Sequence, residues 1–227
     1  GSRLGDTATN GYTLLDPAAP GTRIVHIHPD PDELGHVWRP DVAIVATAPA
    51  MIAALARQNA VPNPVRAGWT KALRADFEGW IQPKETPGAV KMEKVIGWLA
   101  ETLPDDAILT NGAGNFAAFL HRYYSYRGFP TELAPTSGSM GYGFPAAISA
   151  SLEHPGRRVV CVAGDGDIQM TLNEFSTAMQ HGATPITIVA NNGQYGTIRM
   201  HQERTYPGRV SGTRPVSYTH LTLPTKR

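Results

Sequence analysis

The feature that most constrains the fold lies at residues 159–175, VVCVAGDGDIQMTLNEF, where an apolar run ends in a turn of two glycines and two aspartates. The run is rich in valine and bounded by turn residues, so it predicts a buried strand at residues 159–163. Apolar residues at helical spacing after the turn predict a helix at residues 172–181. A fully apolar strand that leads into a helix is typical of a parallel sheet covered by helices.

The same alternation of strand and helix extends on both sides of this segment. The further predicted elements are helices at residues 92–103, 115–122 and 145–152 and strands at residues 107–110 and 185–190. We therefore predict the α/β class, with a doubly wound parallel sheet and helices on both faces. Ligands of such sheets bind beyond the carboxyl ends of the strands, where three turns rich in Gly or Asn fall, at residues 111–115, 165–167 and 191–196.

The chain is predicted to contain two domains joined by a linker. The elements predicted in the first domain are strands at residues 23–29 and 42–47 and a helix at residues 49–58. They indicate the C-terminal part of a Rossmann-like central α/β domain over residues 1–58. Prolines and the lack of a sustained period mark residues 59–88 as a linker with at most one helix, near residues 71–80. The doubly wound domain is expected over residues 89–215.

Both ends of the chain are expected to be incomplete. Residue 1 begins in the middle of a pattern, without a methionine or an element to introduce it. The last residues, VSYTHLTLPTKR, resemble translated adaptor sequence, so we expect a non-native tail at residues 216–227 and a C-terminally truncated second domain. The alternation in YTHLTL also fits a C-terminal strand, which is the competing interpretation.

Composition argues against several functional classes. The hydrophobic content of 41% is ordinary for a globular protein, and a net charge of +1 with scattered Lys and Arg argues against a nucleic-acid partner. No apolar run reaches the roughly 18 residues of a membrane span, and no signal pattern opens the chain, so we expect a cytoplasmic protein without a membrane partner. The one cysteine, Cys161, excludes internal disulfides and lies in an apolar run, which favours a buried packing role.

Polar residues at the predicted turns favour a divalent cation bound together with a phosphate. Asp165 ends a strand at a helix start, and glycines beside it allow close approach of the backbone. Asn192 follows another strand, and its amide oxygen is a second candidate ligand because neighbouring parallel strands bring their carboxyl ends together. Mg²⁺ prefers oxygen ligands and completes its shell with phosphates and water. The inferred ligand is a diphosphate compound carried on Mg²⁺.

Three other interpretations compete with this one. A Gly-Asp-Gly turn alone is weak evidence, because turns between strands and helices commonly contain these residues. An aspartyl-phosphate phosphohydrolase also places D-x-D after an apolar strand, but its motif expects Thr or Val where Gln169 stands. The sequence GAGNFA at residues 112–117 has the dinucleotide-binding form G-x-G-x-x-A. It lacks the following buried strand that should end in an acidic residue, so we interpret it as a chance match.

Longer motifs carry a resemblance to a known family. The segment GDGDIQMTLNEFSTAMQHGATPITIVANN resembles the thiamine-diphosphate signature, in which GDG is followed by NN after a nearly fixed interval, here 27 positions (192 − 165). APTSGSMGYGFPAAISASL resembles the segment that grips the aminopyrimidine of the cofactor, and NNGQYGTIRMHQE continues the likeness. Residues 89–213 thus resemble the acetolactate synthase-like group of the 2-oxo acid decarboxylase and carboligase superfamily, and residues 23–58 resemble the end of its central domain.

The resemblance implies a set of cofactor contacts. Asp165 and Asn192 are implied to ligate Mg²⁺ through side-chain oxygens, and Gln194 through its backbone carbonyl. Gly166 and Asp167 are implied to present backbone amides to the diphosphate. The other positions in the matching motifs that are implied to contact the cofactor are Asn115, Gly138, Ser139, Met140, Gly164, Tyr195 and Gly196. Simple helix capping is the competing role for Asn115.

Two of these positions are implied to set the shape of the cofactor. Met140 is similar to the bulky apolar residue that wedges between the two cofactor rings and forces the bent conformation. Gly138 is implied to hold the pyrimidine amino group through its carbonyl. In this family the cofactor attacks a 2-oxo acid, carbon dioxide leaves, and the product then takes up a proton or a second carbonyl compound. The resemblance therefore implies a lyase or a transferase.

Departures from the family pattern limit what the resemblance implies. The acetohydroxyacid synthases carry Trp where His201 stands, so the choice of second substrate is open. Arg199 and His201 are weak candidates for the substrate pocket, and exposed helix residues are the alternative. The glutamate that activates the cofactor lies in the N-terminal domain of the family, so we expect no catalytic residue and no activity within this chain.

The partners of the parent protein are also implied by the resemblance. A homodimer or tetramer is expected, because the activating glutamate normally reaches across a dimer interface. Some relatives bind FAD in the central domain, and residues 23–58 leave FAD binding undetermined. A non-catalytic cofactor-binding or interaction module is the remaining alternative function.

Overall fold

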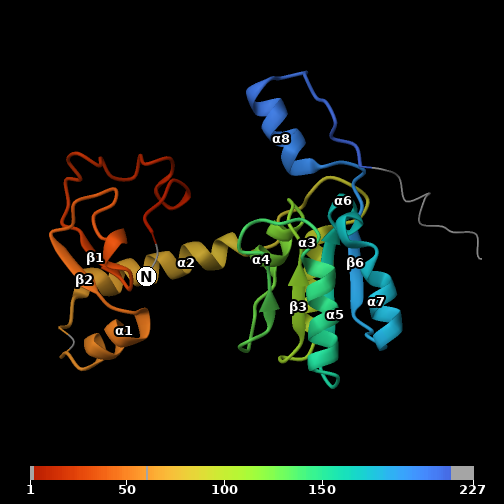
Figure 1. Ribbon diagram of the computed structural model, residues 1–227, viewed down its shortest axis with the longest axis horizontal. Coiled ribbons are helices and arrows are strands. Elements are labelled where there is room, and N and C mark those ends of the chain that lie inside the picture. Colours follow the sequence, from red (N-terminus) through yellow and green to blue (C-terminus); the bar gives the residue numbers. More distant parts are fainter. Residues whose placement is uncertain (1–2, 60, 216–227) are drawn as a thin grey trace, which may run out of the picture. The chain divides into compact units, whose positions relative to one another are not determined.

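The computed structural model describes residues 3–59 and 61–215 (Figure 1). The chain divides into two compact units, Gly1–Trp69 and Thr70–Arg227. The expected tail at residues 216–227 lies outside the described residues. Among the helices of the described residues, none is long and apolar enough to cross a membrane.

The first unit is a small two-stranded α/β arrangement. Strand β1 (Val25–His28) pairs in parallel with β2 (Val42–Val45), and α1 (Ala48–Ala56) follows. The side chain of Thr47 accepts a hydrogen bond from the amide of Ala50 and caps α1. Two short 3-10 helices, η1 (Thr7–Thr9) and η2 (Pro31–Glu33), complete the unit. All three elements predicted in this part of the sequence are present.

Helix α2 (Pro64–Trp80) is longer than the helix predicted near residues 71–80. It begins where two prolines had indicated a break in regular structure. Pro64 occupies the first turn, where proline is well tolerated, and the side chain of Asn63 accepts hydrogen bonds from the amides of Val65 and Arg66. The proline therefore starts the helix instead of preventing it.

The second unit contains a four-stranded parallel sheet in the order β4-β3-β5-β6. Its strands are β3 (Ile108–Asn111), β4 (Glu132–Leu133), β5 (Val159–Gly164) and β6 (Ile186–Ala190). The strands β3, β5 and β6 confirm the predicted ones. The two-residue strand β4 pairs with β3 and was not predicted. It begins at the last residue of a segment, YYSYRGFPTE, that has no strand periodicity.

Four helices of this unit confirm predicted ones with small changes at the ends: α3 (Met92–Thr102), α4 (Ala117–Tyr123), α5 (Gly143–Glu153) and α7 (Glu174–His181). The unit also contains α6 (Asp165–Ile168), the 3-10 helix η3 (Gln169–Thr171) and α8 (Gly196–Thr205). Helix α8 was not among the predicted elements, and neither was the short α6. Helix α6 places a helical turn directly after β5, so the Gly-Asp-Gly-Asp segment is itself helical from its first aspartate.

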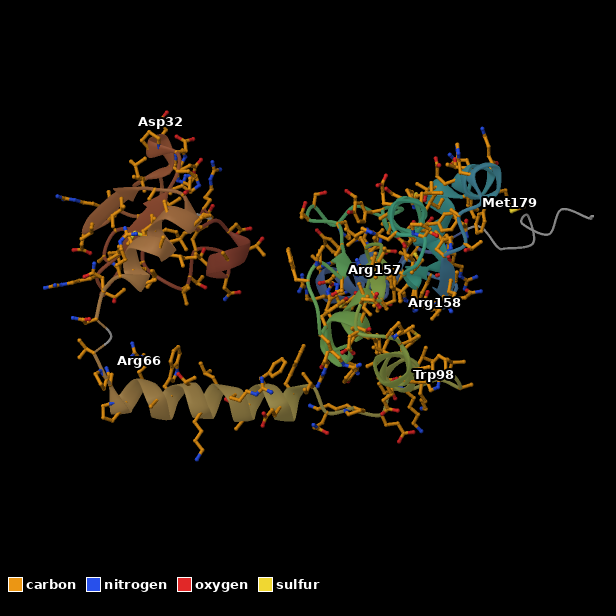
Figure 2. The ribbon with its side chains drawn as sticks, turned by 90° about the horizontal axis from the view of Figure 1, so that it is seen from below. Asp32, Arg66, Trp98, Arg157, Arg158 and Met179 are labelled. Carbon is orange, nitrogen blue, oxygen red and sulfur yellow. The ribbon has the colours of Figure 1, made fainter. Side chains whose placement is uncertain are left out.

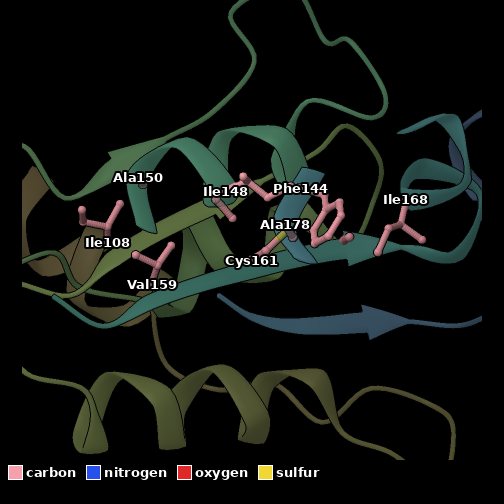
Figure 3. Packing of buried hydrophobic residues seen from close by; sticks show 10 residues of the cluster. Ile108, Phe144, Ile148, Ala150, Val159, Cys161, Ile168 and Ala178 are labelled. Carbon is pink, nitrogen blue, oxygen red and sulfur yellow. The ribbon is translucent and has the colours of Figure 1, made fainter. Parts of the chain in front are cut away.

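Helices cover both faces of the sheet, as a doubly wound fold requires. Val159, Cys161 and Ala163 of β5 pack in one buried cluster with α5 and α7 (Figure 3). Val162 of the same strand packs on the other face, with α3 and α4. This alternation explains why β5 reads as an unbroken apolar run. The outer faces of the helices expose Trp98 on α3 and Met179 on α7 (Figure 2).

The strand order places the switch point of the sheet between β3 and β5. The chain leaves β3 through α4 on one face toward β4, and it leaves β5 through α7 on the other face toward β6. Ligands of open α/β sheets bind at such a switch point, beyond the carboxyl ends of the strands. The start of α5 closes against the end of β3, because a Cβ atom on Gly143 would lie 2.6 Å from the backbone nitrogen of Gly112. The carboxyl edge of the sheet is therefore packed backbone against backbone.

Candidate site at the carboxyl edge of the sheet

The two carboxylates of the Gly-Asp-Gly-Asp segment are both buried but point to different partners. Asp165 and Asp167 have 4% and 2% of their surface exposed. The Oδ2 atom of Asp165 accepts a hydrogen bond of 3.0 Å from the amide of Gly193, in the turn after β6. The Oδ1 atom of Asp167 accepts bonds from the amides of Ala113 (3.1 Å) and Gly141 (2.8 Å). One carboxylate therefore faces the β6 turn, and the other faces the turns before α4 and α5.

Asp167 connects three separate segments of the site. Its side chain joins the start of α6 to the turn after β3 and to the glycine-rich turn before α5. Burial raises its pKa, and hydrogen bonds from the backbone of Gly141, Ala113 and Gly164 act in the opposite direction. Gly112 lies so close to this carboxylate that a Cβ atom would overlap it. The sequence prediction concerned only the backbone amide of Asp167, and it missed this role of the side chain.

The turn after β6 lies beside Asp165, as the parallel register predicts. Gly164 pairs with Ala190, so the residues that follow the two strands are neighbours. The amide of Gly193 is shared between Asp165 and the side-chain oxygen of Asn191, which lies 3.2 Å away. Asn192 folds its side-chain oxygen onto the amide of Gln194 at 3.0 Å. The structure thus brings the three predicted metal ligands into one local region.

These residues fit a Mg²⁺ ion that is bound together with a phosphate compound. The donors are a buried carboxylate, an amide oxygen and a backbone carbonyl, all of them hard oxygen ligands. Each side-chain oxygen that accepts an amide proton here retains a second lone pair for a cation. In the described part of the chain, no group of three His, Cys, Asp or Glu side chains is placed to hold a metal. The donor set therefore suits an ion that takes its remaining ligands from phosphate and water.

The start of α8 meets the turn after β3 across the same edge. The hydroxyl of Thr197 donates a 2.8 Å hydrogen bond to the side-chain oxygen of Asn115. The ring of Tyr195 lies against Gly166 and leaves no room for a side chain there. Gly196 follows Tyr195 and is the first residue of α8. The start of α8 thus lies beside Asn115, and Tyr195 at that start lies against Gly166 of α6. Free amides at helix starts are the setting in which phosphate groups bind.

The turn that carries Met140 borders a pocket with a volume of about 500 Å³. Gly138 adopts a φ of 67°, and the hydroxyl of Ser139 lies 2.9 Å from that of Ser137. Met140 is half-buried. The pocket is lined by Leu133, Ser139, Met140, Gly141, Tyr142, Pro145, Ala146 and Ser149. Because Gly141 donates to Asp167, this turn is attached directly to the Gly-Asp-Gly-Asp segment.

The two weak substrate candidates lie on α8 in different surroundings. Arg199 donates a 3.0 Å hydrogen bond to the side chain of Gln194, so it lies next to the predicted metal turn. His201 is exposed, and its Nδ1 atom lies 2.9 Å from the guanidinium of Arg204 on the same helix. Arg199 is therefore connected to the site, whereas the contacts of His201 are within α8.

A second polar cluster at the end of β3 was not found from the sequence. The buried side chain of Asn111 donates to the carbonyl of Gly112, and its oxygen lies 3.3 Å from the Nε2 atom of His121 on α4. The same Nε2 atom lies 3.3 Å from a carboxylate oxygen of Glu132 on β4. No local pattern indicated this cluster, because its members come from three separate elements.

The geometry does not favour the phosphohydrolase alternative. Such an enzyme needs both carboxylates of its D-x-D motif at one phosphate. Here the side chains of Asp165 and Asp167 bond to turns on different sides of α6.

Comparisons with known proteins agree with the geometry. The family described as "Thiamine pyrophosphate enzyme, C-terminal TPP binding domain" matches residues 112–223. Acetolactate synthase large subunits from Parasynechococcus marenigrum and Haemophilus influenzae are 30% and 28% identical to the chain, each over 94% of its length. An acetolactate synthase from Mycobacterium bovis is 30% identical over 97% of the chain. The chain spans only 34%, 38% and 36% of these relatives, respectively, or about a third of their length.

Proposed function

The chain belongs to the thiamine diphosphate (thiamine pyrophosphate) enzymes, in the group similar to acetolactate synthase, and from this membership we propose a function for the whole protein. It decarboxylates a 2-oxo acid with the help of thiamine diphosphate and Mg²⁺, and then either protonates the product or joins it to a second carbonyl compound. The whole protein acts as a homodimer or tetramer, and the activating glutamate comes from outside residues 89–215. Whether FAD also binds stays open in this proposal.

The observation that carries the proposal is the meeting of Asp165 with the turn after β6. A buried carboxylate lies 3.0 Å from the amide of Gly193, between Asn192 and Gln194. The carboxylate has 4% of its surface exposed, and buried carboxylates in proteins are typically paired or coordinate a metal. We propose that Asp165, Asn192 and the carbonyl of Gln194 hold Mg²⁺ at this point.

Amides at two helix starts are proposed to hold the diphosphate. Gly166 and Asp167 lie in the first turn of α6, and Tyr195 and Gly196 lie at the start of α8. Asn115 is connected to the start of α8 through its bond to Thr197. The fixed dipoles of amides that have no partner within the helix favour an anion.

The turn before α5 is proposed to orient the rings of the cofactor. When bound, thiamine diphosphate supplies a carbon nucleophile for the substrate carbonyl and an electron sink for the departing carboxylate. Met140 borders an apolar pocket and is proposed to pack against the rings, while Gly138 offers its carbonyl as a hydrogen-bond acceptor. Asp167 holds this turn through Gly141, so the ring site and the diphosphate site keep a fixed spacing.

The test is a calorimetric titration of the whole protein with thiamine diphosphate in the presence of Mg²⁺. Asp165→Ala should weaken cofactor binding by at least about a hundredfold, because it removes the only charged ligand proposed for the cation. Asp106→Ala is the matched control, because Asp106 is an exposed aspartate in the same unit whose side chain lies 4.0 Å from Arg157. Equal cofactor affinity in wild type and Asp165→Ala would refute the proposed site.

Two further assays test the identity of the substrate and the phosphohydrolase alternative. A set of 2-oxo acids, assayed for released carbon dioxide with Mg²⁺ and thiamine diphosphate, identifies the substrate. Turnover of a phosphate ester that is lost in Asp165→Asn and does not depend on thiamine diphosphate would favour the phosphohydrolase instead.

A further inference from the structure

The segment after α8 folds back onto this helix and forms a pocket with a volume of about 460 Å³. Two places hold the returning loop. The backbone of Ser211 exchanges two 3.0 Å hydrogen bonds with the side chain of Gln202. The carbonyl of Thr213 accepts a 2.7 Å hydrogen bond from the amide of Tyr195, at the start of α8. Hydrogen bonds therefore hold the loop at Ser211 and at Thr213, and the loop forms one wall of the pocket.

The lining of this pocket is positively charged. Among the described residues, its lining consists of Arg199 from α8 and residues 210–214 of the loop, with Arg214 as the second guanidinium and no acidic side chain. The nearest acidic group is Glu203, whose carboxylate lies 3.8 Å from Arg199. Residues 196–214 contain four arginines and one glutamate, although the whole chain has a net charge of only +1. Two of these four arginines, Arg199 and Arg214, line the pocket.

The pocket is connected to the proposed cofactor site through one hydrogen bond. Arg199 donates to the side chain of Gln194, whose backbone carbonyl is a proposed Mg²⁺ ligand. Tyr195, which anchors the loop through Thr213, packs against Gly166 with its ring. A small molecule in this pocket would lie beside the segments that are proposed to hold the cofactor.

We propose that this pocket binds a small carboxylate anion through Arg199 and Arg214. A guanidinium presents two parallel N–H donors that match a carboxylate, and a pocket lined by two arginines favours a small anion. The volume falls in the range of small-molecule sites, which is roughly 300–1,000 Å³. The identification of the anion as a 2-oxo acid rests on the proposed function, whereas the charge and shape of the pocket do not.

Binding of pyruvate to the whole protein, without thiamine diphosphate and Mg²⁺, tests the proposal separately from cofactor binding. Arg214→Gln should weaken pyruvate binding by about tenfold to a hundredfold, the usual effect of losing a hydrogen-bonded charge. Arg209→Gln is the matched control, because Arg209 belongs to the same segment but stacks on the ring of Tyr206 and does not line the pocket. Arg214→Lys should retain part of the affinity, because it keeps the charge but loses the two-pronged geometry.

Two further ligands show whether the pocket recognises the charge and the carboxylate group of pyruvate. Methyl pyruvate has the same carbonyl group without the charge, and it should not bind measurably. Equal weakening in Arg214→Gln and Arg209→Gln would show a general charge effect and overturn the proposal. Binding of inorganic phosphate without binding of pyruvate would overturn the assignment to a carboxylate. Melting temperatures of the variants show whether a loss of binding comes from unfolding. If Arg214→Gln is unfolded, the test is the affinity of Arg214→Lys for pyruvate, which should be partly retained.

Discussion

Replacement of Asp167 provides the sharpest test of how the site is held together. Its Oδ1 atom accepts hydrogen bonds from the amides of Ala113 at 3.1 Å and Gly141 at 2.8 Å. Asp167→Ala leaves both amides without this acceptor. Asp167→Asn retains an oxygen that accepts both bonds, although it removes the charge. Because neither variant buries a carboxylate, the difference between them reports the hydrogen bonds and packing of this side chain without the cost of burying the charge.

The size of this difference follows from the burial of the two bonds. A buried donor that loses its partner costs about 1–3 kcal/mol. The bond to Gly141 is buried, so its full cost is expected, whereas the bond to Ala113 is partly buried and water replaces some of it. We expect Asp167→Ala to be less stable than Asp167→Asn by about 2–4 kcal/mol. For a unit of this size the corresponding shift in melting temperature is on the order of 10 °C.

Urea unfolding at neutral pH measures the stability of both variants, and hydrogen exchange locates the effect. The amides of Ala113 and Gly141 should exchange much faster in Asp167→Ala than in Asp167→Asn, because exchange reports local opening. Equal stability of the two variants would refute the reasoning, since it would mean that the hydrogen bonds contribute nothing beyond the charge.

Other predictions concern packing, titration and reactivity. Gly143→Ala should destabilise the second unit by about 1–3 kcal/mol in urea unfolding, because the new Cβ would lie 2.6 Å from backbone. Gly97→Ala is its control and should stabilise by about 0.5–1 kcal/mol, because its Cβ meets nothing within 4 Å and the site is inside α3. Hydrogen bonds from Thr86 lower the pKa of Glu93, so the stability that this group contributes is present above its unfolded-state pKa and is lost as pH falls through the lowered value. Glu93→Gln should therefore flatten the acid limb of a plot of unfolding free energy against pH, and an unchanged limb would contradict this. Burial raises the pKa of Cys161 to about 12, so iodoacetamide at pH 8 should label this thiol only after unfolding, and labelling of the folded protein would contradict its buried position.

Local patterns were sufficient to predict the sheet where burial is strong. The strand β5 is buried along its whole length and is apolar on both faces, as a covered central strand of a parallel sheet requires. The turn at Gly164 then identifies its carboxyl edge. In contrast, β4 has two residues and depends on pairing with β3, and α6 has four residues, which is too short for a helical period. Elements of this size are defined by their neighbours and not by their own sequence.

The candidate site was predicted only in part for a related reason. The proximity of Asp165 to the β6 turn follows from parallel strands, which bring their carboxyl ends together whatever the loops contain. The bonds of Asp167 join residues 54 and 26 positions apart, and no rule of strand order specifies them. The same holds for the loop that closes on α8 and brings Arg214 near Arg199, since this contact depends on how the chain returns after the helix.

The distinct roles of the two carboxylates suggest how the site gains affinity for its cofactor. Ordering a loop on binding costs roughly 1–2 kcal/mol per residue in backbone entropy. The turns around Gly112 and Met140 are held in the structure by Asp167, so this cost is met during folding and not during cofactor binding. The side chain of Asp167 can therefore strengthen cofactor binding without touching the cofactor, while Asp165 acts by direct ligation. If so, Asp167→Ala should weaken binding of thiamine diphosphate in proportion to the loosening of Ala113 and Gly141, whereas Asp165→Ala should weaken binding with both amides still protected.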